Sequence, residues 1–163
     1  MKVFNFMRSN VAHPQQVLNM SGLDFTDQAT YRFCCEDNIR FADLDSYGHL
    51  NNVAFATFAE TGRVEFFDKL RKFCVRGEGE SWVIAKLTVN FLAAAYYPST
   101  VTIGHVVTRI GNSSVELHQG LFVNGECFST IESVLVWADT KAESSRPLPD
   151  DLRAELQPFF CEG

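Results

Sequence analysis

Several features are absent from this sequence, and each absence excludes a class of protein. No run of roughly 18 consecutive apolar residues occurs, so no segment is expected to span a membrane. The formal net charge is -6 and no cluster of Lys and Arg appears, which argues against a nucleic-acid partner and against binding to a membrane surface. The first residues, M-K-V-F-N-F-M-R-S-N, lack the uninterrupted apolar core of a signal peptide.

The cysteines form no pattern typical of disulfides or of metal sites. The five cysteines include no C-x-x-C pair, and Cys34 and Cys35 are adjacent, which disfavours a bridge between them. Reduced thiols that behave as small hydrophobic side chains fit this usage better. We therefore expect a cytoplasmic protein.

What the sequence does contain is enough apolar material for one domain with a substantial core. It has 163 residues, of which 46% are hydrophobic and 15 are Phe. Residues 1–28 show no clear periodicity and are expected to be a weakly structured leader or to pack on the surface. Residues 29–140 are expected to form the domain, and residues 141–163 a tail with a short helix.

The order of the expected elements indicates an α+β fold. One strand, one long helix at residues 53–73 and a run of four antiparallel strands follow one another. The predicted strands cover residues 30–41, 81–91, 100–110, 114–123 and 126–137. The dipeptide Asn124-Gly125 predicts a tight hairpin between the last two strands. A curved sheet wrapped around one central helix satisfies this order.

The long helix has one apolar face, and its start is marked by two asparagines. Asn51 or Asn52 is the expected N-cap. Gly62 lies within the apolar face, where it lowers helix propensity, so we expect it to allow a close approach to another backbone. The face consists of Phe55, Phe58, Ala59, Gly62, Phe66, Leu70 and Phe73.

The most informative segment precedes this helix and reads D-L-D-S-Y-G-H-L-N-N from Asp43 to Asn52. It places a carboxylate, Asp45, just ahead of a helix start, where unpaired backbone N–H groups and the positive end of the helix dipole can hold an oxyanion. A base beside an oxyanion site is the minimum equipment for cleaving an activated acyl group. By spacing alone, capping a turn is the favoured role of Asp45, as is common for Asp in loops.

This motif, with the helix that ends F-A-E-T-G-R, resembles the hotdog fold, specifically its 4-hydroxybenzoyl-CoA thioesterase-like acyl-CoA thioesterases. Weaker support comes from residues 82–91, from R-I-G-N-S-S at residues 109–114 and from V-L-V-W-A-D at residues 134–139. The resemblance implies an enzyme that hydrolyses acyl-CoA without a metal or an organic cofactor. It also implies a homodimer or homotetramer with its sites at the subunit interface.

The resemblance carries residue roles onto this chain. The catalytic Asp of the family lies in Asp-x-x-Gly, which maps onto Asp45 and Gly48, and the backbone N–H that polarises the carbonyl maps onto Asn52. His49 is a further catalytic candidate, although loop hydrogen bonding explains it equally well. The segment A-A-A-Y-Y before Pro98 lacks the Arg or Lys of many relatives, so contacts to the CoA phosphates cannot be mapped there.

Other residues near the motif have two interpretations each. Tyr47, Gly48, Asn51 and Phe55 are candidate substrate contacts, with Asn51 also a cap and Phe55 also a core residue. Glu60 is an alternative base, because some related enzymes use a helix carboxylate, yet an ion pair with Arg63 is the simpler role.

The remaining acids of the motif suggest structure rather than metal binding. Asp43 lies outside the Asp-x-x-Gly pattern and is expected to be structural. With no second cluster of ligands, no metal is expected.

Two other functions use the same fold. Hydratases and dehydratases of acyl thioesters resemble Asp-x-Asn-Pro-x-His or carry a His-Phe-Pro run, and this sequence has neither. A non-enzymatic acyl-CoA-binding module would usually bring a DNA-binding helix pair, for which the leader is too short and not basic enough.

Overall fold

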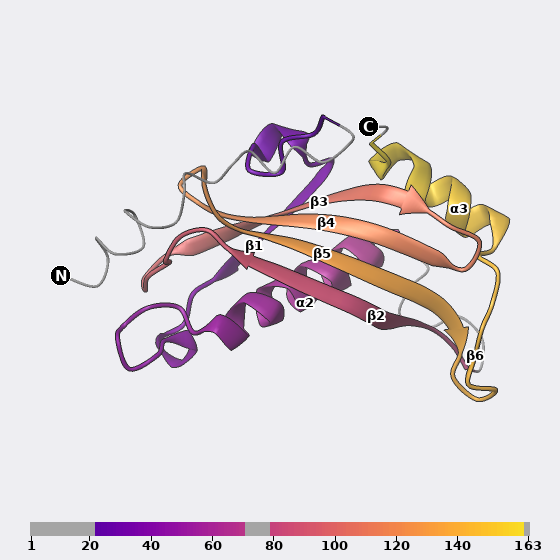
Figure 1. Ribbon diagram of the computed structural model, residues 1–163, viewed down its shortest axis with the longest axis horizontal. Helices are drawn as coiled ribbons and strands as arrows, with labels where there is room; N and C mark the ends of the chain where they lie inside the picture. Colours follow the sequence, from indigo (N-terminus) through magenta and orange to yellow (C-terminus); the bar gives the residue numbers. More distant parts are fainter. Residues whose placement is uncertain (1–21, 71–78, 162–163) are drawn as a thin grey trace.

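The computed structural model describes residues 22–70 and 79–161, and their elements follow the expected order (Figure 1). The helices are α2 (Asn52–Lys69) and α3 (Asp150–Leu156). The strands are β1 (Phe33–Asn38), β2 (Glu80–Phe91), β3 (Thr100–Ile110), β4 (Ser114–Val123), β5 (Glu126–Asp139) and β6 (Ser144–Ser145). Short 3-10 turns occupy Gln28–Thr30, Phe41–Asp43 and Gln157–Phe159.

The strands form one antiparallel sheet in the order β1-β3-β4-β5-β2, with β6 paired to β5 (Figure 1). The predicted hairpin is confirmed: Asn124 and Gly125 link β4 to β5 with φ values of 52° and 82°. Positive φ at both central residues is what a type I′ turn requires. The predicted first strand is shorter than expected, since residues 41–43 form a 3-10 turn that leads into the loop.

Helix α2 crosses one face of the sheet and begins at the predicted place. The Asn51 side chain accepts a hydrogen bond from the backbone N–H of Val53, so Asn51 is the N-cap. The helix ends at Lys69, earlier than residue 73, and Phe73 lies outside the described residues. The predicted apolar face is buried from Phe55 to Leu70.

Gly62 permits a close approach, but to side chains of β3 rather than to another backbone. A Cβ at this position would lie 2.6 Å from Cε1 of His105 and 2.6 Å from Cγ2 of Ile103. The helix therefore lies on β3 at a distance that only glycine allows.

Segments on both sides of the predicted domain contribute to its packing. Phe25 is buried, stacks on His118 and accepts a hydrogen bond on its carbonyl oxygen from the Tyr31 hydroxyl. In α3, Leu152 and Leu156 are fully buried in the same cluster as Phe66 and Trp137. The division into leader, domain and tail stays a prediction, but Phe25, Leu148, Leu152 and Leu156 pack as parts of the core.

Within the described ranges, no helix is both long and apolar enough to cross a bilayer.

Candidate active site

The loop between β1 and α2 is a closed turn built around Asp45. Leu44 and Leu50 form an isolated β-bridge at its base. The Asp45 N–H donates to the carbonyl oxygen of His49 at 2.8 Å, and the Gly48 N–H donates to the carbonyl oxygen of Asp45 at 3.1 Å. Gly48 has φ of 77°, the left-handed conformation that glycine adopts without strain. The backbone alone therefore brings the two ends of the turn together.

The Asp45 carboxylate holds this turn with only one of its oxygens. Oδ1 accepts the backbone N–H of Tyr47 at 2.8 Å and that of His49 at 3.1 Å. Oδ2 accepts no hydrogen bond from the described residues, and the side chain is half-buried. The turn-capping interpretation of Asp45 is therefore correct for Oδ1, while Oδ2 stays available for chemistry.

Asp43 is committed to a different task. Its Oδ2 accepts the Arg40 backbone N–H at 2.8 Å and the Arg40 Nε–H at 3.0 Å. These bonds and the positive charge of Arg40 lower the pKa of the Asp43 carboxyl, against the opposing effect of partial desolvation, which is the largest single contribution. Its carbonyl oxygen also accepts the Asn51 N–H at 2.8 Å. Asp43 thus anchors the loop to the helix start.

The start of α2 presents an unused backbone donor. The Asn51 side chain takes the N–H of Val53 at 3.0 Å, and the Asn51 carbonyl oxygen takes that of Ala54 at 2.9 Å. The N–H of Asn52, the first residue of the helix, donates to no acceptor in the described part of the chain. An exposed, unbonded N–H at a helix N-terminus can stabilise an oxyanion.

Aromatic side chains surround the loop. The His49 ring meets Tyr96 edge to face, with centroids 5.3 Å apart. Tyr47 is 82% exposed at the tip of the turn. Phe55 is buried, and its ring packs against those of Phe91 and Phe128 at 4.8 and 5.5 Å. Phe55 is therefore a core residue that supports the half-exposed Phe91.

The predicted ion pair between Glu60 and Arg63 is wrong. Glu60 is exposed, whereas Arg63 turns inward onto the sheet, where Nη1 donates to Oε1 of Gln119 at 3.2 Å and to Oγ of Ser133 at 3.4 Å. Hydrogen bonds to buried acceptors on the sheet stabilise the Arg63 guanidinium more than an ion pair with a solvated carboxylate on the helix surface would. Glu60 is thus left without the partner that would have explained it structurally.

The sequence pattern did not identify Gln119 and Ser133 as partners of Arg63. They lie on β4 and β5, far along the chain from Arg63, and no local motif marks them. A polar residue at an inward position of an otherwise apolar strand is the one available signal.

Within residues 22–70 and 79–161, no three His, Cys, Asp or Glu side chains are grouped so that they could hold a metal ion.

A curved antiparallel sheet around one long helix, with a carboxylate loop at the helix start, defines a hotdog-fold thioesterase. The chain belongs to the thioesterase-like superfamily, whose sequence profile matches residues 39–156. The match begins just before the Asp45 loop and runs through the end of α3, so it includes every candidate site residue.

Individual relatives agree with this assignment. An acyl-acyl carrier protein thioesterase of Arabidopsis thaliana, ATL2, described as chloroplastic, is 28% identical over 131 residues, which cover 78% of this chain and 69% of the relative. A predicted thioesterase from Bacillus stearothermophilus has a similar structure, with a TM-score of 0.72 and 28% identity over 80% of this chain and 98% of that one. A Thermus thermophilus thioesterase, solved with coenzyme A and Zn, has a TM-score of 0.69 and 26% identity over 78% and 98%.

The family and its relatives make this protein a thioester hydrolase. The fold prediction and the enzyme class are therefore confirmed, and the site residues stay predictions.

Proposed function

We propose that this protein hydrolyses an acyl-CoA thioester to the free acid and CoA, with Asp45 as the general base or nucleophile. The backbone N–H of Asn52 stabilises the oxyanion that develops on the thioester carbonyl. His49 lies beside Asp45 in the same turn, in contact with the Tyr96 ring, and borders the place where the thioester would lie.

The reaction balances without any further group. Oδ2 of Asp45 takes a proton from water as the water oxygen attacks the carbonyl carbon, and the resulting oxyanion accepts the Asn52 N–H. When the tetrahedral intermediate collapses, the C–S bond breaks and the thiolate leaves with the proton returned by the carboxyl group. In the nucleophilic variant Oδ2 attacks the carbon itself, and water then hydrolyses the mixed anhydride.

One observation carries this proposal: the same short loop holds a carboxylate oxygen and a helix N–H that no other group of the described residues uses. Oδ1 of Asp45 is fixed by two backbone donors, which orients Oδ2. Asn51 satisfies the N–H groups of Val53 and Ala54 but not that of Asn52. A fixed base with a fixed oxyanion donor is the preorganised arrangement that acyl transfer needs.

Glu60 is the competing base. It lies on the exposed side of α2, about two turns after Asn52, and has no ion-pair partner among the described residues. Asp45 is favoured because hydrogen bonds hold its carboxylate in place, whereas no hydrogen bond within residues 22–70 and 79–161 holds the Glu60 side chain. Hydrolysis by Asp45→Asn compared with hydrolysis by Glu60→Gln decides between the two bases.

The acyl carrier is the other open choice. The bound coenzyme A of the Thermus thermophilus protein supports CoA as the carrier here. The Arabidopsis thaliana relatives are described as acting on acyl carrier protein, so this carrier belongs in the same assay. Equal acyl groups on the two carriers, assayed side by side, give the preference as a ratio of kcat/KM values.

Assembly follows from the edge of the sheet. Strand β2 pairs only with β5 within the described ranges, so the backbone of its other edge is unpaired there. A long apolar edge strand invites pairing with a second copy. We propose a cytoplasmic homodimer or homotetramer. The molar mass in solution, measured by light scattering after size-exclusion chromatography, tests the assembly.

The decisive experiment is hydrolysis of an acyl-CoA panel, with detection of the free thiol, by the wild type and by Asp45→Asn. The Asn amide oxygen can still accept the N–H groups of Tyr47 and His49, so the turn is preserved. We expect kcat to fall about 100-fold or more, the usual effect of removing a general base.

Two matched variants control this result. Asp43→Asn changes the neighbouring acid of the same loop and should retain most activity, because Asp43 is bonded to Arg40. If Glu60→Gln abolishes hydrolysis while Asp45→Asn does not, the base is Glu60 and the assignment of Asp45 is wrong.

A further inference from the structure

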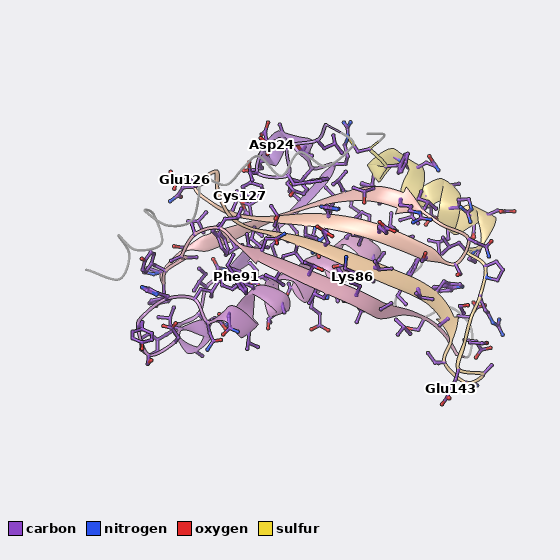
Figure 2. All side chains as sticks on the ribbon, viewed as in Figure 1. Asp24, Lys86, Phe91, Glu126, Cys127 and Glu143 are labelled. Atoms are coloured by element: carbon purple, nitrogen blue, oxygen red, sulfur yellow. The ribbon has the colours of Figure 1, made fainter. Side chains whose placement is uncertain are left out.

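Helix α2 covers only part of the concave face of the sheet. It packs mainly on β1, β3 and β4, and reaches the inward side of β2 at the two ends of that strand, where Phe67 stacks on Trp82 and Phe55 meets Phe91. On that side Ile84, Leu87 and Phe91 are 45%, 38% and 56% exposed, although their cross-strand partners on β5 are buried. These three side chains form an apolar open strip that runs along β2 beside the helix; Phe91 marks one end of it (Figure 2).

A buried cation lies next to this open strip. Arg63 is only 9% exposed, and its Nη1 donates to Gln119 on β4 and to Ser133 on β5. Ser133 is paired directly with Leu87 of the open strip. The guanidinium thus lies where the covered part of the sheet meets the uncovered part. We call Arg63, Gln119, Ser133 and His105 the Arg63 cluster.

The acceptors of this cation are locked in place. Gln119 Nε2 lies 2.9 Å from the carbonyl oxygen of Ala59 and 2.8 Å from Nε2 of His105. With both amide hydrogens used, Oε1 must point at Arg63, and the Ser133 hydroxyl donates to the same oxygen at 3.4 Å. Burial lowers the pKa of His105 to about 3, so its ring is neutral and adds no charge.

The positive charge of Arg63 has no close counter-ion. Among the described residues, no carboxylate lies within ion-pair distance of its guanidinium, and Glu60 acts on it only through a longer-range attraction. A buried charge without a partner is costly, and apolar replacements of buried charges often stabilise a protein. This cost points to a use for the charge.

Three N–H groups of the guanidinium remain available to a ligand. Only Nη1 has acceptors within the described residues, which leaves Nε and Nη2. Neither of these two nitrogen atoms is fully enclosed by the described residues, so solvent reaches both. The cluster therefore holds one side of the guanidinium and presents the other.

We infer that the Arg63 cluster is a subsite for an oxygen acceptor, a carboxylate above all, at the far end of the acyl group. The inference rests on the proposed function, because it places the thioester at Asn52. Arg63 follows Asn52 by 11 helical residues, roughly 16 Å along the axis. A medium-length acyl chain lying on the open strip spans that separation, and its polar end meets Nε and Nη2.

This subsite defines a substrate class that the apolar open strip alone would not select. A plain alkyl end next to Arg63 would leave the guanidinium desolvated and unpaired. A carboxylate would accept the two free edges of the planar fork in parallel, the strongest pairing that Arg makes. The preferred substrates are then ω-carboxy acyl thioesters, followed by ω-hydroxy and finally unsubstituted ones.

The test compares CoA esters of equal chain length that end in a carboxylate, a hydroxyl or a methyl group. For the wild type we expect kcat/KM to favour the carboxylate end by about tenfold or more at the best length. In Arg63→Met this preference should disappear, so that the ratio of kcat/KM for the carboxylate-ended ester to that for the methyl-ended ester falls to about one. Arg63→Lys, which keeps the charge but not the fork, should keep only part of it.

Arg109→Met is the matched control, because Arg109 is an exposed arginine of β3 paired with Glu116. It should leave the preference unchanged. A wild type without any preference, or an Arg63→Met variant that loses all substrates equally while folded, would overturn the subsite.

A binding readout separates this inference from the proposed function. Non-hydrolysable thioether analogues with the same three ends are titrated into wild type and Arg63→Met, and Kd is measured by calorimetry. A carboxylate preference in Kd that needs Arg63, without hydrolysis of any ester, would keep the subsite and overturn the proposed catalysis. Hydrolysis with equal Kd values would do the reverse.

Discussion

The Asp45 loop at the start of α2 and Arg63 farther along the helix are held in opposite ways. At its start, the Asp45 loop is closed by backbone hydrogen bonds between residues that lie within a few positions of one another. Eleven residues later, Arg63 is held by Gln119 and Ser133, which come from strands far along the chain. The loop is exposed at Tyr47 and Gly48, whereas Gln119 and His105 are fully buried.

This difference separates orientation from burial. The loop can orient a carboxylate and leave it wet, since short-range bonds fix its geometry without a packed surrounding. The Arg63 cluster needs the whole sheet to remove water from around a charge, and each of its members must satisfy the next. Substitutions in the cluster should therefore affect folding, and substitutions in the loop should affect mainly activity.

The largest effect on stability is expected from Gln119→Leu. It removes the acceptor of Arg63 and the donor to Ala59 and His105 at once, so several buried groups lose their partner. We expect a loss of roughly 3 kcal/mol in the free energy of unfolding. Urea denaturation measures it, with Gln28→Leu in an exposed turn as the control. A change as small as that of the control would mean that the cluster is not a unit.

Next comes Gly62→Ala, compared with Gly48→Ala. The first places a Cβ 2.6 Å from His105 and Ile103 and should cost about 2 kcal/mol by overpacking. The second meets open space but has φ of 77°, so its cost of about 1 kcal/mol is local strain. Thermal denaturation of both variants should keep this order. The reverse order would mean that the helix can shift away from β3.

The pH dependence of the free energy of unfolding reports on the burial of His105 in the Arg63 cluster. Burial lowers the pKa of His105 from 6.5 to about 3, so the folded protein binds fewer protons than the unfolded chain below pH 6.5. Stability is therefore full above that pH and falls as the pH drops towards 3, by at most about 1.4 kcal/mol per pH unit from this group. Burial lowers the pKa of His118 too, with the same sign.

The measurement is the urea midpoint at a series of pH values between 7 and 4, for wild type and His105→Leu. The variant should show a shallower slope over this range, whatever its absolute stability, because the carboxylates titrate in both proteins. An unchanged slope would mean that His105 takes up a proton in the folded state.

The smallest effect on stability belongs to the loop. Asn51→Ala removes the side chain that caps the Val53 N–H and should cost about 1 kcal/mol. This variant also loosens the helix start that holds the Asn52 N–H. We therefore expect kcat to fall even under conditions in which the variant is fully folded. Asn51→Ser, which can still cap, should restore both. A fall in stability without any fall in kcat would separate the cap from the oxyanion site.

Much of the architecture could be predicted because it depends on short-range patterns. The predicted strands at residues 81–91, 100–110, 114–123 and 126–137 agree with β2 to β5 to within two residues. The positive φ values at Asn124 and Gly125 follow from residue type, and Asn51 caps as its side chain dictates. The Asp45 turn belongs here too, since its bonds join residues two to four positions apart. In each case the interacting groups are neighbours in the sequence.

The fold, the thioesterase family and the carboxylate loop could all be predicted, because a few adjacent residues carry each of these signals. The packing of α2 on the sheet was needed to place Arg63 against Gln119 and Ser133 rather than against Glu60, and Gly62 against His105. A helix pattern shows that residues three apart can meet, but not whether a buried acceptor on a distant strand competes for the same donor. The packing of α2 on the sheet settles that competition, because desolvation strengthens the buried hydrogen bonds over a surface ion pair.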